Sequence, residues 1–280
     1  MLVSKNGIIK GKYGKPILME YGYIPNGIKK PIIVFAHGFK GFKDWGHFNK
    51  VMEFFIENGF AFVKFNFSHN GGTIDQPIDF PDLEAFGNNN FTKELNDLRC
   101  VIDWVVGNNE IPTREIDTEQ IYLIGHSRGG GVAILAANED KRIKKLVTWA
   151  AVSDLVNRYD AEVMEHWKKE GVLYIANGRT KQQMPLYYQL AEDTIKNKDR
   201  FNIEKAASKL TVPHLIVHGT SDEVVPVAEA KNINQWNKHS EITILSGGDH
   251  TFGTTHPYVE KTLKGDVAIV LDKTLEFIKG

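Results

Sequence analysis

The chain has 280 residues, of which 42% are hydrophobic and 25% are charged, a balance typical of a globular domain. Its 34 Lys and Arg side chains nearly balance 35 Asp and Glu side chains. A formal net charge of −1 with no basic tract argues against a protein that binds nucleic acid or another polyanion. A single cysteine, Cys100, excludes an internal disulfide framework, and its apolar neighbours at helical spacing predict a near-core helix position.

The sequence also lacks the signals of a secreted or membrane protein. Residues 1–11 are interrupted by Lys, Asn and Gly, so they do not form the apolar core of a signal peptide. No apolar run approaches the roughly 18 residues that a membrane span requires. We therefore expect a soluble, cytoplasmic protein without a membrane partner. The sequence does not define an oligomeric state.

Strand-like and helix-like patterns alternate along most of the chain, after an antiparallel hairpin predicted over residues 8–10 and 17–24. Short apolar runs predict strands over residues 31–36, 60–67, 120–125, 146–151, 214–217 and 242–245. Apolar residues at helical spacing predict helices over residues 48–56, 95–106 and 129–137, after Pro226, and at the end of the chain to near Ile278. This alternation predicts an α/β fold, a mostly parallel sheet with helices on both faces.

One stretch interrupts the alternation, because residues 153–210 separate two core strands by far more than a normal connection. This stretch holds a helical pattern over residues 161–169, the hairpin signal Asn177-Gly178 after an apolar run, and a Lys-rich helical pattern over residues 192–207. We expect residues 1–152 and 211–280 to form one core, and residues 153–210 to form an inserted cap over one end of the sheet.

The pattern Gly125-x-Ser127-x-Gly129 lies at the junction of a predicted strand and a predicted helix. In a nucleophile elbow, the sharp strand-to-helix turn leaves no room for side chains at the two glycines and exposes the serine hydroxyl. The alternative is a glycine-rich turn whose serine only caps the helix. The strand–turn–helix context favours the elbow, and Ser127 is the candidate nucleophile.

A serine hydroxyl is a poor nucleophile without a base, and the base needs an acid to orient it. Asp222, just past the strand at residues 214–217, is the candidate acid, with capping of the helix after Pro226 as its alternative role. Asp154 is a rival after an earlier strand, where Ser153 and Asp154 also suit the cap of the first inserted helix. The chain order Ser…Asp…His favours Asp222.

The candidate base is His250, in a glycine-rich loop after the last strand, where the alternative is a solvated loop histidine. His256 is the rival, but it precedes Pro257 and is expected to lead into the final helix. His126 is excluded because it adjoins the serine. In His37-Gly38-Phe39, His37 is expected to hold the loop.

An oxyanion hole completes the predicted site. The backbone amides of Phe39 and Arg128 are expected to bind the negative charge that forms when the serine attacks a carbonyl. Other chemistries lack support, because the sequence contains no H-E-x-x-H, no paired cysteines, no Walker motif and no G-x-G-x-x-G after the first strands. We expect neither a metal nor a cofactor.

Together these motifs resemble the α/β-hydrolase superfamily. The resemblance rests on His37-Gly38-Phe39, on Gly125 to Gly130, on His218-Gly219 with Asp222 and Val225-Pro226, and on Gly248-Asp249-His250. The loop, the short cap with a hairpin and Arg179-Thr180 are similar to bacterial carboxylesterases of the cinnamoyl/feruloyl-esterase type and to prolyl-oligopeptidase-like hydrolases. That resemblance implies an eight-stranded sheet in which only the second strand is antiparallel.

The function predicted from these residues is a cofactor-independent serine hydrolase that cleaves small-molecule carboxylic esters. A peptidase or a thioesterase with the same triad is the nearest alternative, and a non-catalytic binding protein of the same fold is another. Five cap aromatics are candidates for a substrate pocket or for anchors of the cap: Tyr159, Trp167, Tyr174, Tyr187 and Tyr188. Lys40 and Lys43 make the oxyanion loop unusually basic, with either substrate or solvent as their partner.

Overall fold

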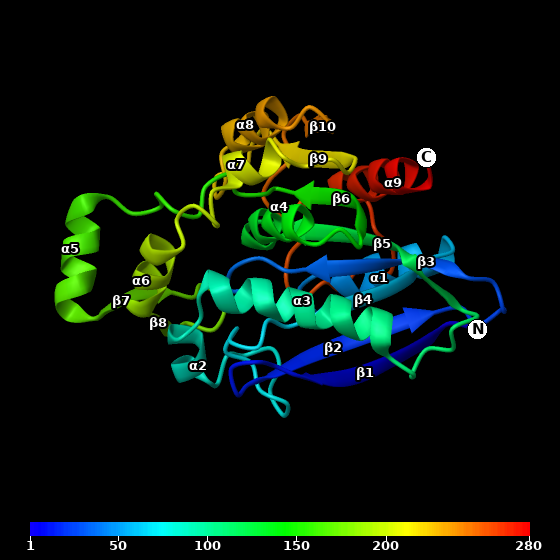
Figure 1. Ribbon diagram of the computed structural model, residues 1–280, viewed down its shortest axis with the longest axis horizontal. Helices are drawn as coiled ribbons and strands as arrows, with labels where there is room; N and C mark the ends of the chain where they lie inside the picture. Colours follow the sequence, from blue (N-terminus) through cyan, green and yellow to red (C-terminus); the bar gives the residue numbers. More distant parts are fainter.

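In the computed structural model, which describes residues 1–280, eight strands form one twisted sheet (Figure 1). Their order is β1-β2-β4-β3-β5-β6-β9-β10, and only β2 runs against the other strands. This arrangement confirms the predicted α/β-hydrolase sheet. The strands are β1 (Val3–Lys10), β2 (Pro16–Tyr23), β3 (Lys30–Ala36), β4 (Ala61–Phe65), β5 (Ile116–His126), β6 (Ile143–Trp149), β9 (His214–Gly219) and β10 (Ser240–Leu245).

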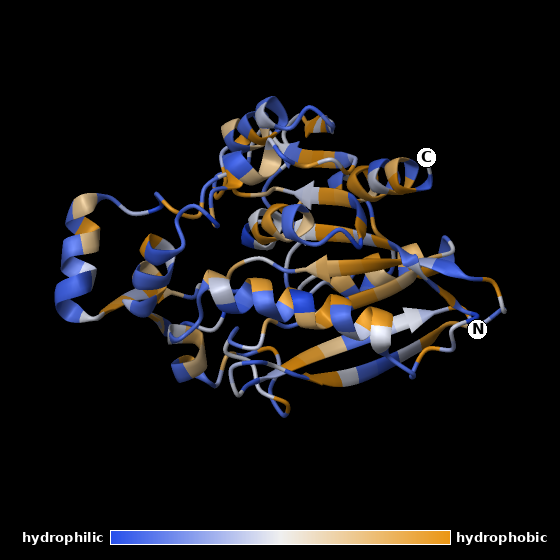
Figure 2. Cartoon of the chain, viewed as in Figure 1, coloured by the Kyte–Doolittle hydropathy of each residue, from blue (hydrophilic) through white to orange (hydrophobic).

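Helices cover both faces of the sheet. Along β3, Ile32 and Val34 belong to a buried cluster shared with α3 (Phe91–Gly107), α4 (Arg128–Glu139) and α8 (Val227–Trp236). Ile33 and Phe35 belong to a second cluster shared with α1 (Phe48–Glu57) and α9 (Asp266–Lys279). Because β3 is buried on both sides, its sequence is a continuous apolar run rather than an alternating one. Figure 2 shows this concentration of hydrophobic residues along the strands.

The helices of the core are α1 (Phe48–Glu57), α2 (Leu83–Gly87), α3 (Phe91–Gly107), α4 (Arg128–Glu139), α8 (Val227–Trp236) and α9 (Asp266–Lys279). No helix combines the length and the apolar composition needed to cross a membrane. Most lie where the sequence predicts them, but α2 was not predicted, and α3 begins at Phe91 rather than Leu95. The Asn90 side chain caps α3 by accepting a hydrogen bond from the Lys93 amide. Cys100 lies in α3, partly buried against the core, as predicted.

The chain between β6 and β9 forms α5 (Ala161–Glu170), β7 (Val172–Ala176), β8 (Gln183–Tyr187), α6 (Gln189–Lys196) and α7 (Ile203–Ala207). β7 and β8 form the predicted antiparallel hairpin. α5 lies at the outer edge of the molecule in Figure 1, whereas α7 packs against α4 and α8.

Two predictions in this segment are wrong. The Asp160 side chain, rather than Ser153 or Asp154, caps α5 by accepting a hydrogen bond from the Val163 amide. The helical pattern over residues 192–207 is divided into α6 and α7, because Asn202 caps α7 and starts a new helix there.

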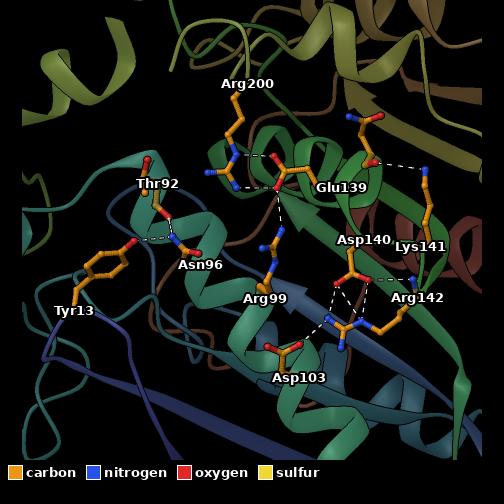
Figure 3. Close-up of polar contacts among 11 residues, drawn as sticks. Tyr13, Thr92, Asn96, Arg99, Asp103, Glu139, Asp140, Lys141, Arg142 and Arg200 are labelled. Carbon is orange, nitrogen blue, oxygen red and sulfur yellow. Dashed lines mark hydrogen bonds and ion pairs between the residues drawn. The ribbon is translucent and has the colours of Figure 1, made fainter. Parts of the chain in front are cut away.

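Ion pairs join this segment to the core helices (Figure 3). Glu139, at the end of α4, accepts two hydrogen bonds from Arg200, of 2.7 and 2.8 Å, and one from Arg99 on α3 at 3.2 Å. A bidentate Arg–carboxylate pair fixes geometry better than a single ion pair does. The chain between α6 and α7 is therefore held against the same helix whose first turn follows Ser127.

His214, at the start of β9, is fully buried between β6 and α8. Its Nε2 lies 2.9 Å from the Thr148 hydroxyl, and its Nδ1 lies 3.1 Å from the Asn237 amide nitrogen. Because Asn237 Nδ2 is a donor, Nδ1 accepts and Nε2–H donates, which is the neutral imidazole. Burial lowers the pKa of His214 to about 3.

This buried imidazole makes stability sensitive to acid. The unfolded ring takes up a proton near pH 6.5, whereas the folded ring stays neutral to about pH 3, so stability is complete above pH 6.5 and falls as the pH decreases. We expect His214→Gln to reduce that slope by about 1.4 kcal/mol per pH unit between pH 6 and pH 4. Urea unfolding across this range measures the slope, with exposed His239→Gln as the control. Equal slopes in His214→Gln and wild type would contradict the prediction.

Candidate active site

Ser127 stands in the turn between β5 and α4, where its backbone adopts a φ of 56° and a ψ of −124°. A Cβ on Gly125 would lie 2.5 Å from the Gly129 carbonyl oxygen, and a Cβ on Gly129 would lie 2.3 Å from the His37 carbonyl oxygen. Both distances are far inside van der Waals contact, so only glycine fits at either position. The strained turn aims the serine side chain away from the strand, as in a nucleophile elbow.

Two distant segments bring an imidazole and a carboxylate to this serine. His250, in the loop after β10, has its Nε2 3.0 Å from Ser127 Oγ and its Nδ1 2.8 Å from Asp222 Oδ2. Asp222 follows β9, and the parallel strands β5, β9 and β10 end at the same edge of the sheet. With Nδ1–H donated to the carboxylate, Nε2 presents a lone pair to the serine hydroxyl.

The Asp222 carboxylate is fully buried but ionised. Burial raises its pKa, but hydrogen bonds from His218, His250 and the Val225 amide outweigh burial and hold the pKa well below its usual range. Its other oxygen accepts from the amides of Val224 and Val225, so the residue also forms the turn before α8. One carboxylate thus orients the imidazole and shapes its own loop.

His218 is a positioning residue that sequence reasoning did not assign. It is fully buried at the end of β9, and its Nε2 lies 3.2 Å from Asp222 Oδ2 and 2.8 Å from the Val225 carbonyl oxygen. Both neighbours are acceptors, so Nε2 carries the proton. A histidine in a buried strand, four residues before the candidate acid, is the sequence signal that could have found it.

Two more neutral imidazoles hold the backbone around the site. Burial lowers the pKa of His126 to about 3, and its Nε2 donates to the His250 carbonyl oxygen at 2.9 Å. Burial lowers the pKa of His37 to about 4, and its Nδ1 donates to the Gly38 carbonyl oxygen at 2.8 Å. Neither ring contacts the serine hydroxyl, in agreement with the predicted exclusion of His126 and the predicted structural role of His37.

The rival residues lie elsewhere. Asp154 Oδ1 accepts from the amides of Val156 and Asn157, at 2.7 and 3.0 Å, and forms a local turn. His256 Nδ1 accepts from the Gly46 amide at 2.9 Å, and a cis peptide bond follows it. The expectation that His256 leads into the final helix is wrong, because α9 begins only at Asp266.

The loop after β3 approaches the serine closely. A Cβ on Gly38 would lie 2.8 Å from Ser127 Cβ, so this position also needs glycine. The next amide, that of Phe39, donates no hydrogen bond within the protein. Arg128 is the first residue of α4, so its amide has no acceptor one helical turn earlier. Two such amides beside a candidate nucleophile suit an oxyanion hole.

The Arg128 side chain stabilises this loop from the other side. Its guanidinium pairs with Glu94, a buried residue of α3, and lies 4.2 Å from the centre of the Phe39 ring. A cation held over an aromatic face is attracted by the ring quadrupole, so the stack fixes Phe39 next to α4. Sequence reasoning missed Glu94, whose only signal is an acidic residue on the inner face of an amphipathic helix.

Ser127 opens on an apolar cavity of about 210 Å³ between the core and the segment 153–210. The two cations at this cavity, Arg128 and Arg158, are each paired, with Glu94 and Glu229 respectively. The apolar lining residues include Phe39, Phe91, Leu155, Met164, Leu186, Leu190, Ile195 and Val224.

Of the five aromatics of the segment, two line the cavity, two pack or bond within the protein, and one is exposed. Tyr159 and Trp167 line the cavity, and the Trp167 indole donates to a β8 carbonyl oxygen at 2.7 Å. Tyr188 packs against Trp167, with 6.1 Å between ring centres. Tyr187 donates to a carboxylate of α2 at 2.6 Å and anchors the hairpin. Tyr174 is 62% exposed and faces solvent.

The two lysines of the loop after β3 differ. Lys43 is buried and forms ion pairs with Asp44 at 2.7 Å and Glu20 at 3.4 Å, so it is part of the framework. Lys40 is half-buried and donates to the Ala176 carbonyl oxygen at 3.2 Å. No group of three or more His, Cys, Asp or Glu side chains is placed to hold a metal ion.

The sequence of this chain matches a protein family and a named relative. The profile of the BD-FAE family matches residues 23–236. A protein of Mycoplasma pneumoniae, by name an esterase/lipase, is 23% identical over 265 residues that cover 87% of this chain and 90% of the relative.

Solved structures share the whole fold. Est1E from Butyrivibrio proteoclasticus, with ferulic acid bound, has a TM-score of 0.73 and 21% identity, covering 98% of each chain. The α/β hydrolase GrgF from Penicillium sp. sh18 has a TM-score of 0.74 and 17% identity, covering 99% of this chain and 98% of the other.

The hydrogen-bonded path from Asp222 to Ser127 predicts one unusually reactive serine. We expect a fluorophosphonate to label Ser127 alone, and Asp222→Asn to slow labelling by about 10³-fold or more, because the amide no longer orients the imidazole. Asp154→Asn, at the rival aspartate, should label at the wild-type rate. Mass spectrometry of the labelled protein measures both. Equal slowing by the two variants would contradict the assignment of Asp222.

Proposed function

Because this chain belongs to the BD-FAE family, it is an α/β-hydrolase of the esterase type, and we propose that it hydrolyses carboxylic esters through an acyl-enzyme on Ser127. The observation that carries the proposal is the unbroken path from Ser127 Oγ through His250 to the Asp222 carboxylate. A binding protein of the same fold does not need an imidazole aligned on the serine.

In the proposed acylation, Ser127 Oγ bonds to the ester carbonyl carbon while His250 Nε2 takes the hydroxyl proton. The carbonyl oxygen becomes an anion and accepts hydrogen bonds from the amides of Phe39 and Arg128. Each such donor contributes on the order of 3 kcal/mol to the transition state. Asp222 stabilises the imidazolium that forms.

The intermediate then collapses, and the carbon–oxygen bond to the alcohol breaks. His250 gives its proton to the departing alcohol oxygen, which leaves an acyl group on Ser127. In deacylation, water attacks the same carbon, His250 takes the proton of the water, and the carboxylic acid leaves as the proton returns to Ser127. No cofactor enters these steps.

The apolar cavity supports esters of small to medium acyl or aryl acids. Each methylene that enters it gains about 0.8 kcal/mol, and its only cations are already neutralised by Glu94 and Glu229. The ferulic acid bound to Est1E is an aryl acid of this kind. We propose that the segment 153–210 acts as a cap that sets the acyl preference, because much of the cavity wall belongs to it.

We expect wild-type protein to hydrolyse 4-nitrophenyl butyrate and Ser127→Ala to lose at least about 10⁴-fold in kcat, because the nucleophile is gone. Release of 4-nitrophenolate measures this loss, and circular dichroism confirms that the variant is folded. Turnover by Ser127→Ala at the wild-type rate would contradict the proposal. Aminoacyl anilides and acyl-CoA, assayed on the same sample, distinguish an esterase from a peptidase or a thioesterase.

A further inference from the structure

Ser127 lines two cavities that differ in their charged residues. Besides the apolar cavity, a second one of about 220 Å³ opens on its other side, and the two share only Ser127 and Phe39. His250 lines the second cavity and not the apolar one. Its lining combines the polar residues Lys40, His126, Asn177, Arg179 and Thr251 with the aromatic residues Trp45 and Phe48 and with Gly38 and Gly41.

The position of the imidazole decides which half of an ester occupies each cavity. His250 Nε2, which takes the serine proton, must hand a proton to the alcohol oxygen as that oxygen leaves. The alcohol half must therefore lie within hydrogen-bond reach of His250, on the side of the second cavity. The acyl half then occupies the apolar cavity, where no imidazole contacts it.

The second cavity carries uncompensated positive charge. Its lining contains Lys40 and Arg179 but no Asp or Glu. Arg179 is neutralised by Asp79 at 2.7 Å, whereas Lys40 has no carboxylate within 4.0 Å. The Lys40 ammonium has three N–H donors, and its one acceptor within the protein is the Ala176 carbonyl oxygen at 3.2 Å. A half-buried cation with free donors beside a leaving-group site favours an anion.

The placement of Lys40 ties it to the reacting centre. Lys40 directly follows Phe39, whose amide is the proposed oxyanion donor, and its ammonium lies 6.0 Å from the centre of the Phe39 ring. Its backbone has a φ of 55°, a conformation that usually selects glycine or asparagine. Lys40 itself lines the second cavity.

We propose that the natural substrate is an ester of an apolar acid with an alcohol that carries an anionic group, a carboxylate or a phosphate, which Lys40 binds in the second cavity. This inference rests on the proposed ester hydrolysis and deepens it, because it specifies the charge of the leaving half.

A matched pair of substrates tests whether the enzyme prefers a negative charge on the alcohol half of the ester. The butyrate esters of glycolic acid and of glycolamide share the acyl group and the shape of the alcohol, and differ only in whether the alcohol carries a carboxylate or a neutral amide. We expect the wild type to prefer the glycolate ester by about fivefold in kcat/KM, the factor that corresponds to an ion pair of about 1 kcal/mol. A butyrate ester of 2-hydroxyethyl phosphate, against glycolate, distinguishes phosphate from carboxylate as the preferred anion.

Variants of Lys40 test whether its side chain causes the preference for the glycolate ester. Lys40→Gln should bring the ratio of the two kcat/KM values close to one, chiefly by raising KM for the glycolate ester, and Lys40→Arg should restore the ratio. Lys181→Gln is the matched control, because Lys181 has a similar φ of 59° and the same charge, lies in the neighbouring hairpin loop and does not line the cavity. This control should keep the wild-type ratio.

The outcomes separate this inference from the proposed function. If the wild type hydrolyses neither of the two butyrate esters nor 4-nitrophenyl butyrate, the proposed function as an ester hydrolase is wrong. If it hydrolyses both esters without preference, or if Lys40→Gln lowers both equally, Lys40 is only a structural tether to the hairpin and the inference is wrong. Moving the charge to the acyl half tests the cavity assignment: a preference for ethyl hemisuccinate over ethyl succinamate would contradict it.

Discussion

The left-handed turn at Ser127 is the constraint on which the rest of the site depends. A non-glycine residue in this conformation is disfavoured by about 1–3 kcal/mol, so the surrounding structure must hold it there. The close packing of Gly38, Gly125 and Gly129 does so, because backbone carbonyls and the Ser127 side chain occupy the space where a Cβ would be. The turn fixes the hydroxyl at the sheet edge where the loops after β3, β9 and β10 converge.

Around this turn, hydrogen-bond partners give each imidazole a separate role. His37 and His126 are kept neutral by burial, and each donates its N–H group to a backbone carbonyl oxygen. His218 donates instead to the Asp222 carboxylate, which remains the one buried anion behind His250. As a result, His250 is the imidazole with a nitrogen directed at the serine hydroxyl, and the others hold its loop and its partner in place.

Local patterns in the sequence predicted the sheet and singled out Ser127, Asp222 and His250, which the structure brings together, because the strand–turn–helix glycine pattern, the buried parallel strands and the glycine-rich loops are each defined by neighbouring residues. What the sequence did not predict depends on contacts between distant segments. Glu94 matters because Arg128 reaches it across the site, and His218 matters because Asp222 turns back toward it. The break between α6 and α7 depends on the cap at Asn202, within a continuous helical pattern. The difference in charge between the two cavities could be seen only once the chain was folded.

A crystal structure of the protein after reaction with an alkyl fluorophosphonate tests the arrangement most directly. We predict phosphorus bonded to Ser127 Oγ, the phosphoryl oxygen accepting hydrogen bonds from the amides of Phe39 and Arg128, and His250 on the opposite side, still hydrogen-bonded to Asp222. A phosphoryl oxygen directed into solvent, or an imidazole turned away from both Ser127 and Asp222, would contradict the catalytic site described above.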